Sequence, residues 1–288
     1  MTIHEFSSFY NESILAQLKI EENKKWVDKF HITESNRDFR FRKKDFNFNI
    51  DNNSVKHYKL NGTLFFQRPH FKISRSKFLL RKVELDPWKN DKIQRNFAIS
   101  KFKPNDDDII IVSDIDEVLD SRMSNELISY VHQNGIITVG LHYTLYFFNL
   151  FSENWYGPPN YSYRVFLMTG EYFKKMQMDS DTLRKMGERG DLINKIKCFP
   201  EIAGFHHSWL GDEKFLLQKL KAYPHAQSEH DSSIYDKNNE PDSLKLKELL
   251  LLGKSIYGAE HKLKIRNDIS PLEFVEANRN SIYRDLFL

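Results

Sequence analysis

Two aspartates, Asp114 and Asp116, follow directly after a short apolar run, Ile109–Val112. An uninterrupted β-branched run is typical of a strand buried on both faces, and alternate strand residues point to the same side. We therefore expect the two carboxylates to face one ion. Two carboxylates that leave positions for water and phosphate oxygens suit Mg²⁺ or Mn²⁺, and such a metal neutralises a diphosphate leaving group. A solvated acidic turn that caps the next helix is the other interpretation.

A pair of histidines, His206 and His207, stands in the stretch GFHHSW. Neutral imidazole is a good ligand for Mn²⁺ or Zn²⁺. A single histidine is more often a satisfied core or surface residue than a ligand. Because this pair lies between a predicted strand and the start of a predicted helix, we expect one imidazole to reach the site.

The residues after the aspartates separate this chain from one class of phosphatase. Haloacid-dehalogenase-type phosphatases have Asp-x-Asp-Gly-Thr after an apolar strand. Here Glu117 and Val118 stand where the glycine and the threonine would be, which argues against that class.

Strands and helices must alternate to position these side chains. Periodicity and β-propensity predict strands at 26–33, 109–112 and 136–141 and helices at 12–25, 88–100, 122–133, 181–187, 212–222 and 243–254. Alternation over the first 140 residues favours an α/β fold with parallel strands, whose ligands bind beyond the carboxyl ends of the strands. Asp242 or Ser243 is the expected N-cap of the last helix.

Composition limits the function classes. The chain has 288 residues, 40% of them apolar, and a net charge of +3, so a folded protein without a nucleic-acid partner is expected. Basic and phenylalanine residues interleave at 37–48, where edge strands and loops are favoured over nucleic-acid binding. A single cysteine, Cys198, and the lack of a visible signal peptide or spanning apolar run indicate a soluble, cytoplasmic protein. Peripheral contact with a membrane stays open.

Five stretches, in order, resemble glycosyltransferase family 17, which includes the enzyme that adds the bisecting N-acetylglucosamine to N-glycans. Residues 9–12 (FYNE) resemble the family's FFNE, and residues 27–36 (VDKFHITESN) its VDKFVIVESN. The others are 94–96 (QRN), 107–117 (DDIIIVSDIDE, against DDIIIISDVDE) and 204–209 (GFHHSW, against GWHxSW). Leu119 departs from the family's proline, and residues 60–87 resemble it poorly.

The resemblance implies a GT-A type α/β fold with a Rossmann-like nucleotide-binding sheet flanked by helices. We expect one domain over residues 1–288, with a nucleotide-sugar-binding half (1–135), an acceptor-binding half (136–258) and a C-terminal extension (259–288). It implies a UDP-sugar donor, UDP-N-acetylglucosamine in characterised members, a glycan acceptor, a divalent cation (Mn²⁺ or Mg²⁺) and transfer with inversion.

The resemblance also implies roles for particular residues. Asp114 and Asp116 match the family's metal-binding Asp-x-Asp, and His206 matches its histidine, which is expected to be a further ligand of the metal or of the diphosphate. The residues expected on the nucleotide side, together with Asp114, are Glu12, Glu34, Asn36, Arg95 and Asn96. Two further residues are expected at the substrate-binding site: Trp155, beside a Gly-Pro-Pro turn, for stacking on a sugar ring of the acceptor, and Arg164 for the diphosphate.

The catalytic base must lie across the sugar from the diphosphate, so it should not be a metal ligand. Glu213 is the first candidate, followed by Glu117 and Asp120; a charge favoured by the helix dipole is the other interpretation of Glu213. A metal-dependent phosphohydrolase and a non-catalytic carbohydrate-binding protein are the alternatives to a transferase. Metal-dependent binding of UDP distinguishes the transferase from both.

Overall fold

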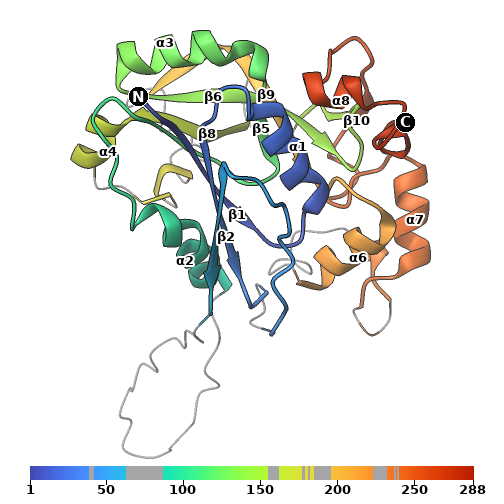
Figure 1. Cartoon of the computed structure of the whole chain (residues 1–288). Helices are drawn as coiled ribbons and strands as arrows, with labels where there is room; N and C mark the ends of the chain where they lie inside the picture. The colour runs from blue at the N-terminus through green and yellow to red at the C-terminus, as the bar shows by residue number, and fades with distance from the viewer. Residues whose placement is uncertain are drawn as a thin grey trace, which may run out of the picture.

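The fold is a large mixed sheet with helices on both faces, seen in a computed structural model (Figure 1). The structure describes residues 1–38, 42–62, 87–154, 162–176, 179–180, 182–184, 196–222, 232–236, 238 and 240–288. Within these ranges the sheet has ten strands, and eight of them run in the order β10-β7-β6-β8-β4-β1-β2-β3. Strand β9 pairs with β6 and with β5. The bounds are β1 Ile3–Phe9, β2 Lys29–Ser35, β3 Val55–Leu60, β4 Ile109–Val112, β5 Glu117–Leu119, β6 Ile136–Leu145, β7 Leu150–Ser152, β8 Ser162–Thr169, β9 Lys197–Ser208 and β10 Leu263–Ile265.

One half of the sheet is parallel, as the sequence predicts. Strand β1 pairs in parallel with β2 and with β4, and β2 pairs in parallel with β3. The carboxyl ends of these strands therefore lie at one edge of the sheet. Strand β8 runs antiparallel to both β4 and β6, which ends the parallel half immediately beside β4.

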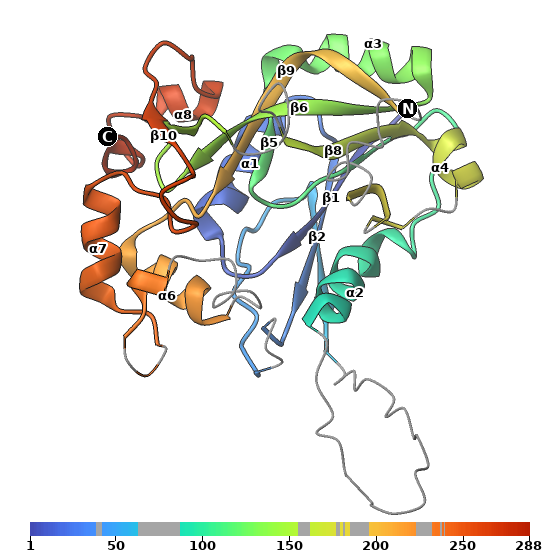
Figure 2. The ribbon, with the colours of Figure 1, turned by 180° about the vertical axis from the view of Figure 1, so that it is seen from behind.

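Helices cover both faces of this half (Figure 2). Ile109 and Ile111 of β4 share a core cluster with residues of α1 and α3, whereas Ile110 and Val112 share another with residues of α2. Alternate residues of one buried strand thus contact different helices, which explains why the run is apolar throughout. The helices are α1 Ser13–Asn23, α2 Pro87–Ile99, α3 Ser124–Asn134, α4 Gly170–Met176, α6 Glu213–Ala222, α7 Ser243–Leu251 and α8 Glu273–Ala277.

Most predicted elements are confirmed, with shifted ends. The strand predicted at 26–33 begins only at Lys29, because the amides of Trp26 and Val27 still donate to the Asn23 carbonyl at the end of α1. Strand β1 was not predicted, although it lies in the middle of the parallel half. The predicted N-cap Asp242 is confirmed, since its carboxylate accepts from the amides of Leu244 and Lys245. The helix predicted at 181–187 lies largely outside the described residues.

The segment 259–288 joins the same fold. Strand β10 pairs antiparallel with β7, and α8 packs against α1. None of the helices in the described ranges has the length and apolar character needed to cross a bilayer. The proposed division into two functional halves stays a prediction.

Candidate functional site

The acidic motif forms a tight turn between two strands. Strand β4 ends at Val112 and β5 begins at Glu117. The Glu117 amide donates to the Asp114 carbonyl at 3.1 Å, and the Glu117 carboxylate accepts from the Asp114 amide at 2.7 Å. Because residues 114–116 are not in a strand, the alternation expected to align Asp114 with Asp116 does not apply there.

Asp114 faces two arginines. Its carboxylate accepts from Nη2 of Arg95, on α2, at 3.1 Å and also from Arg184. Arg95 is held in turn by Asp91, at 3.3 Å. Asp114 and Arg95, both expected at the nucleotide side, therefore lie together. The guanidinium of Arg184 lies beside them and was not predicted from the sequence.

Asp116, Glu117 and His206 form the cluster that could hold a metal. Glu117 pairs with His206 across the antiparallel strands β5 and β9, so their side chains lie on the same face. One ligand atom from each of the three residues lies within 4.8 Å of the others, and His206 Nε2 is 3.5 Å from Asp116 Oδ2. The amide of His207 donates to the Asp116 carbonyl at 2.8 Å, which fixes the turn against β9.

The electrostatics of the cluster suit a divalent cation. Burial lowers the pKa of His206, which keeps its imidazole neutral and able to coordinate. Burial opposes ionisation of Asp116, but the hydrogen bond from His206 and the positive charges of Lys219 and Arg164 hold the pKa of Asp116 below its ordinary value. Burial, followed by the neighbouring Asp116, raises the pKa of Glu117 to about 7.

An unsatisfied oxygen strengthens this interpretation. Glu117 is 1% exposed, and its Oε1 has no hydrogen-bond partner among the residues that the structure describes. A buried polar atom without a partner costs free energy and calls for an explanation. Two carboxylates and a neutral imidazole form a donor set that Mn²⁺ accepts readily, and Mg²⁺ accepts its oxygens. The residues present therefore fit the implied metal.

Several residues expected at the nucleotide side make structural contacts within the protein. Glu34 is fully buried, and its carboxylate accepts from Lys44 Nζ at 2.5 Å and from the amides of Asn47 and Phe48 at 2.7 and 3.1 Å. It anchors the segment after β2 and has no surface left for a nucleotide. Asn36 accepts from the Gly62 amide at 2.8 Å and so joins the ends of β2 and β3.

Glu12 and Asn96 are also engaged within the protein. The Glu12 carboxylate accepts from the amides of Tyr10 and Asn11, both at 3.0 Å, and lies 3.3 Å from Lys219 Nζ. Asn96 accepts from the Ser180 amide at 2.8 Å. Arg164, on β8, lies close enough to the cluster to affect the pKa of both Asp116 and Glu117. Trp155 lies outside the described residues.

The three candidate bases occupy different surroundings. Glu213 is in the first turn of α6, and its carboxylate accepts from Ser243 Oγ at 2.6 Å. Asp120 binds the Arg122 guanidinium with both oxygens, at 2.8 and 2.6 Å, and caps the 3₁₀ turn that begins at Ser121. Glu117 belongs to the metal cluster. The structure thus does not bring Asp120 to the cluster.

The structure also reveals two lysines at the site that sequence reasoning missed. Lys19 of α1 lies beneath the acidic turn, and Lys219 of α6 reaches Glu12 and lies 5.3 Å from the ring centre of Trp209. The only sequence signal for Lys19 is its place on the apolar face of an amphipathic helix, between Leu18 and Ile20, where a charge is unexpected.

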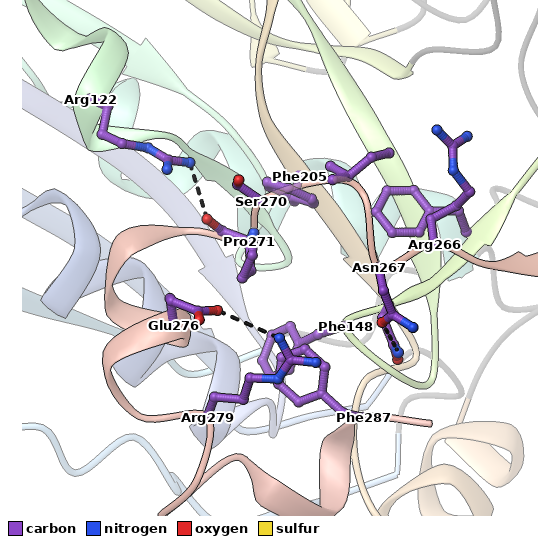
Figure 3. Close-up of a pocket in the computed structure, with 13 residues that line it drawn as sticks. Arg122, Phe148, Phe205, Arg266, Asn267, Ser270, Pro271, Glu276, Arg279 and Phe287 are labelled. Atoms are coloured by element: carbon purple, nitrogen blue, oxygen red, sulfur yellow. Dashed lines mark hydrogen bonds and ion pairs between the residues drawn. The ribbon is translucent and has the colours of Figure 1, made fainter.

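A separate cavity lies near the C-terminal segment (Figure 3). Its volume is about 280 Å³, and Phe205 of β9 lines it, whereas the next residue, His206, belongs to the metal cluster. Adjacent strand residues face opposite sides, so β9 separates the cavity from the cluster. Of the residues predicted for the site, none lines this cavity.

The architecture and the site together define a class. A sheet whose parallel half carries an acidic turn at its carboxyl edge, with helices on both faces, is consistent with a GT-A-like glycosyltransferase fold. Comparison with family models agrees, because the model for glycosyltransferase family 17 matches residues 3–244. The match spans most of the chain, and the chain belongs to glycosyltransferase family 17. It is therefore a glycosyltransferase, which takes a sugar donor and an acceptor. A search among curated proteins gave no match.

Proposed function

We propose that this chain is a metal-dependent, inverting glycosyltransferase that transfers N-acetylglucosamine from UDP to a hydroxyl group of a glycan. The observation that carries the metal dependence is the cluster of Asp116, Glu117 and His206, with the unpartnered Oε1 of Glu117. The sugar, the nucleotide and the inversion rest on the family resemblance. A cytoplasmic location belongs to the same proposal and rests on the single cysteine, Cys198.

The roles of the residues follow from their surroundings. Asp116, Glu117 and His206 would hold Mn²⁺ or Mg²⁺, with Asp114 at the adjoining position. The bound metal would supply positive charge to neutralise the diphosphate leaving group. Arg95 and Arg184 bring two guanidinium groups to the same turn, and guanidinium is well suited to phosphate oxygens.

Glu213 is the base in this proposal. Among the three candidates it alone is neither in the metal cluster nor held by an arginine in the described contacts. General-base assistance contributes about 10²–10⁴-fold to rate, so Glu213→Gln should lower kcat by a factor in that range. A variant with wild-type kcat would exclude Glu213 as the base.

Thermal stability measures the donor and metal requirement directly. Wild-type protein is heated with UDP, GDP, CMP or UDP-N-acetylglucosamine, each with and without Mn²⁺. A ligand at about 100 times its Kd stabilises the folded state by about 2.7 kcal/mol, which raises Tm measurably. We expect this stabilisation with UDP compounds only when Mn²⁺ is present.

Two aspartate variants make the test specific. Asp116→Asn should lose the Mn²⁺-dependent shift. Asp106→Asn is the matched control, because Asp106 belongs to another Asp-x-Asp triplet and lies exposed beside Lys174. An equal shift in Asp116→Asn and wild type would refute the metal assignment. Release of inorganic phosphate without sugar transfer would favour the phosphohydrolase, and sugar binding without metal or nucleotide would favour the carbohydrate-binding protein.

A further inference from the structure

A buried lysine lies directly beneath the acidic turn. Lys19, in the middle of α1, is 0% exposed. Its Nζ donates to the carbonyl of Asp114 at 3.0 Å and to the carbonyl of Glu117 at 2.5 Å. These two carbonyls belong to the first and last residues of the turn, so one side chain joins both ends of it from inside the protein.

The same lysine is tied to the neighbouring strands. Its Nζ lies 2.8 Å from Ser113 Oγ and 2.7 Å from Oε1 of Glu5, which is on β1 and is 1% exposed. Ser113 Oγ also donates to Glu5 Oε1 at 2.9 Å. The ammonium group thus has four acceptors within hydrogen-bonding distance for its three N–H donors. Helix α1, strand β1 and the acidic turn meet at this one atom.

Stability alone is a poor explanation for this arrangement. Burying an ion pair carries a large desolvation cost, and replacing a buried ion pair with apolar residues of similar volume often leaves the folded protein equally stable. An apolar side chain could fill the space of Lys19 but could not hold two main-chain carbonyls. What the lysine adds is therefore a fixed conformation of the turn.

We infer that Lys19 is a positioning residue, which holds the 114–117 turn so that Asp116 and Glu117 present their carboxylates to one cation beside His206. The inference rests on the proposed metal site and extends it to a residue that touches neither the cation nor the substrates. With the two carbonyls tied to Lys19, the turn keeps its shape when the cluster is empty. Groups behind the ligands of a metal site commonly change its affinity by about 10–100-fold.

The test removes the ammonium group without leaving its partner charge buried. In the double variant Glu5→Met, Lys19→Met, two unbranched apolar side chains replace the ion pair, so no unpaired carboxylate remains at position 5. Circular dichroism and Tm establish that the variant is folded. Mn²⁺ affinity is then measured from the electron paramagnetic resonance signal of free Mn²⁺, at a temperature where all variants are folded. We expect Kd to rise by about 10–100-fold.

Glu22 provides the matched control on the same helix. It is 2% exposed, and its carboxylate accepts from Ser121 Oγ at 2.6 Å and from the Phe274 amide at 2.7 Å. Glu22→Gln therefore disturbs a buried polar group of α1 without touching the acidic turn. We expect it to lower Tm and to leave the Kd for Mn²⁺ unchanged, which separates general destabilisation from loss of positioning.

The outcomes distinguish the inference from the proposal beneath it. If wild-type protein binds no Mn²⁺, the proposed metal site is wrong and the inference is overturned with it. If wild type binds Mn²⁺ and the folded double variant binds it equally well, only the inference is overturned. If the double variant does not fold, Lys19→Gln decides, because its shorter amide cannot reach both carbonyls. An unchanged Kd in that variant also overturns the inference.

Discussion

A histidine in the middle of the sheet should make the folded state sensitive to mild acid. His31 of β2 is buried, and its ring stacks on Phe6 at 4.2 Å between centroids. Its Nε2 lies 3.0 Å from His4 Nδ1, and its Nδ1 lies 3.0 Å from the Tyr58 hydroxyl. Burial, followed by the nearby His4, Lys56 and Lys29, lowers the pKa of His31 from 6.5 to about 3.

The sign and size of the effect follow from that difference. Between these two pKa values the unfolded chain binds a proton at position 31 and the folded chain does not, so stability falls as pH falls. The loss begins as pH drops through the unfolded value of 6.5 and levels off below the folded value of about 3. Between pH 6.5 and about pH 5 the free energy of unfolding falls by about 1.4 kcal/mol per pH unit, so His31 lowers the stability by about 2 kcal/mol at pH 5.

Urea unfolding at about pH 7 and pH 5, followed by circular dichroism, measures this loss. His31→Gln keeps hydrogen-bonding capacity but cannot take up the proton, so it should lose about 2 kcal/mol less than wild type over this interval. The matched control is His132→Gln, since His132 is exposed on α3 and should leave the wild-type pH dependence in place. Equal losses in wild type and His31→Gln would refute the reasoning.

Two further substitutions test the packing around the site. A Cβ at Gly204 would lie 2.2 Å from the Val118 carbonyl oxygen, so Gly204→Ala should force β9 away from β5, destabilise the protein by about 1–3 kcal/mol and weaken Mn²⁺ binding. Wild-type urea unfolding and Kd would contradict this. Glu34→Gln should cost about 1.5–3 kcal/mol in urea unfolding, because the buried carboxylate loses its charge-assisted bond with Lys44. Because the structure makes Glu34 an anchor, the same variant should keep its Mn²⁺ affinity, and a large change there would contradict that role.

The sequence predicts a strand or helix well where burial alone determines its pattern of apolar and polar residues. The run Ile109–Val112 is apolar because both of its faces are covered, and it forms β4 as expected. Strand β1 was missed because Glu5 and Ser7 interrupt its apolar pattern. Glu5 pairs with Lys19, more than ten residues away along the chain, and Ser7 contacts Ser113, more than a hundred residues away. A local sequence pattern cannot reveal such partners.

The site was predicted in part for the same reason. Contiguous motifs identified Asp116 and His206, and the structure brings these two together. The place of Glu117 beside them depends on the pairing of β5 with β9, which the sequence does not show. Glu34 and Asn36 stand at motif positions, yet their side chains hold the chain together after β2. A motif position therefore indicates only the region of a residue, and the contacts of its side chain show whether it holds the surrounding chain in place.

The rule of alternating strand faces fails at one motif and holds at the other. Asp114 and Asp116 lie beyond the end of β4, in a turn, so the alternation of strand residues does not itself direct both carboxylates to one ion. Strand β9 continues through Ser208, so His206 and His207 must face opposite sides. His206 meets Asp116, whereas His207 contacts Thr144 Oγ1 at 2.7 Å and stacks on Phe205. Burial lowers the pKa of both imidazoles, so titration does not choose between them. The face of the strand decides which histidine can serve as a ligand, and the antiparallel partner β5 places Glu117 on that same face.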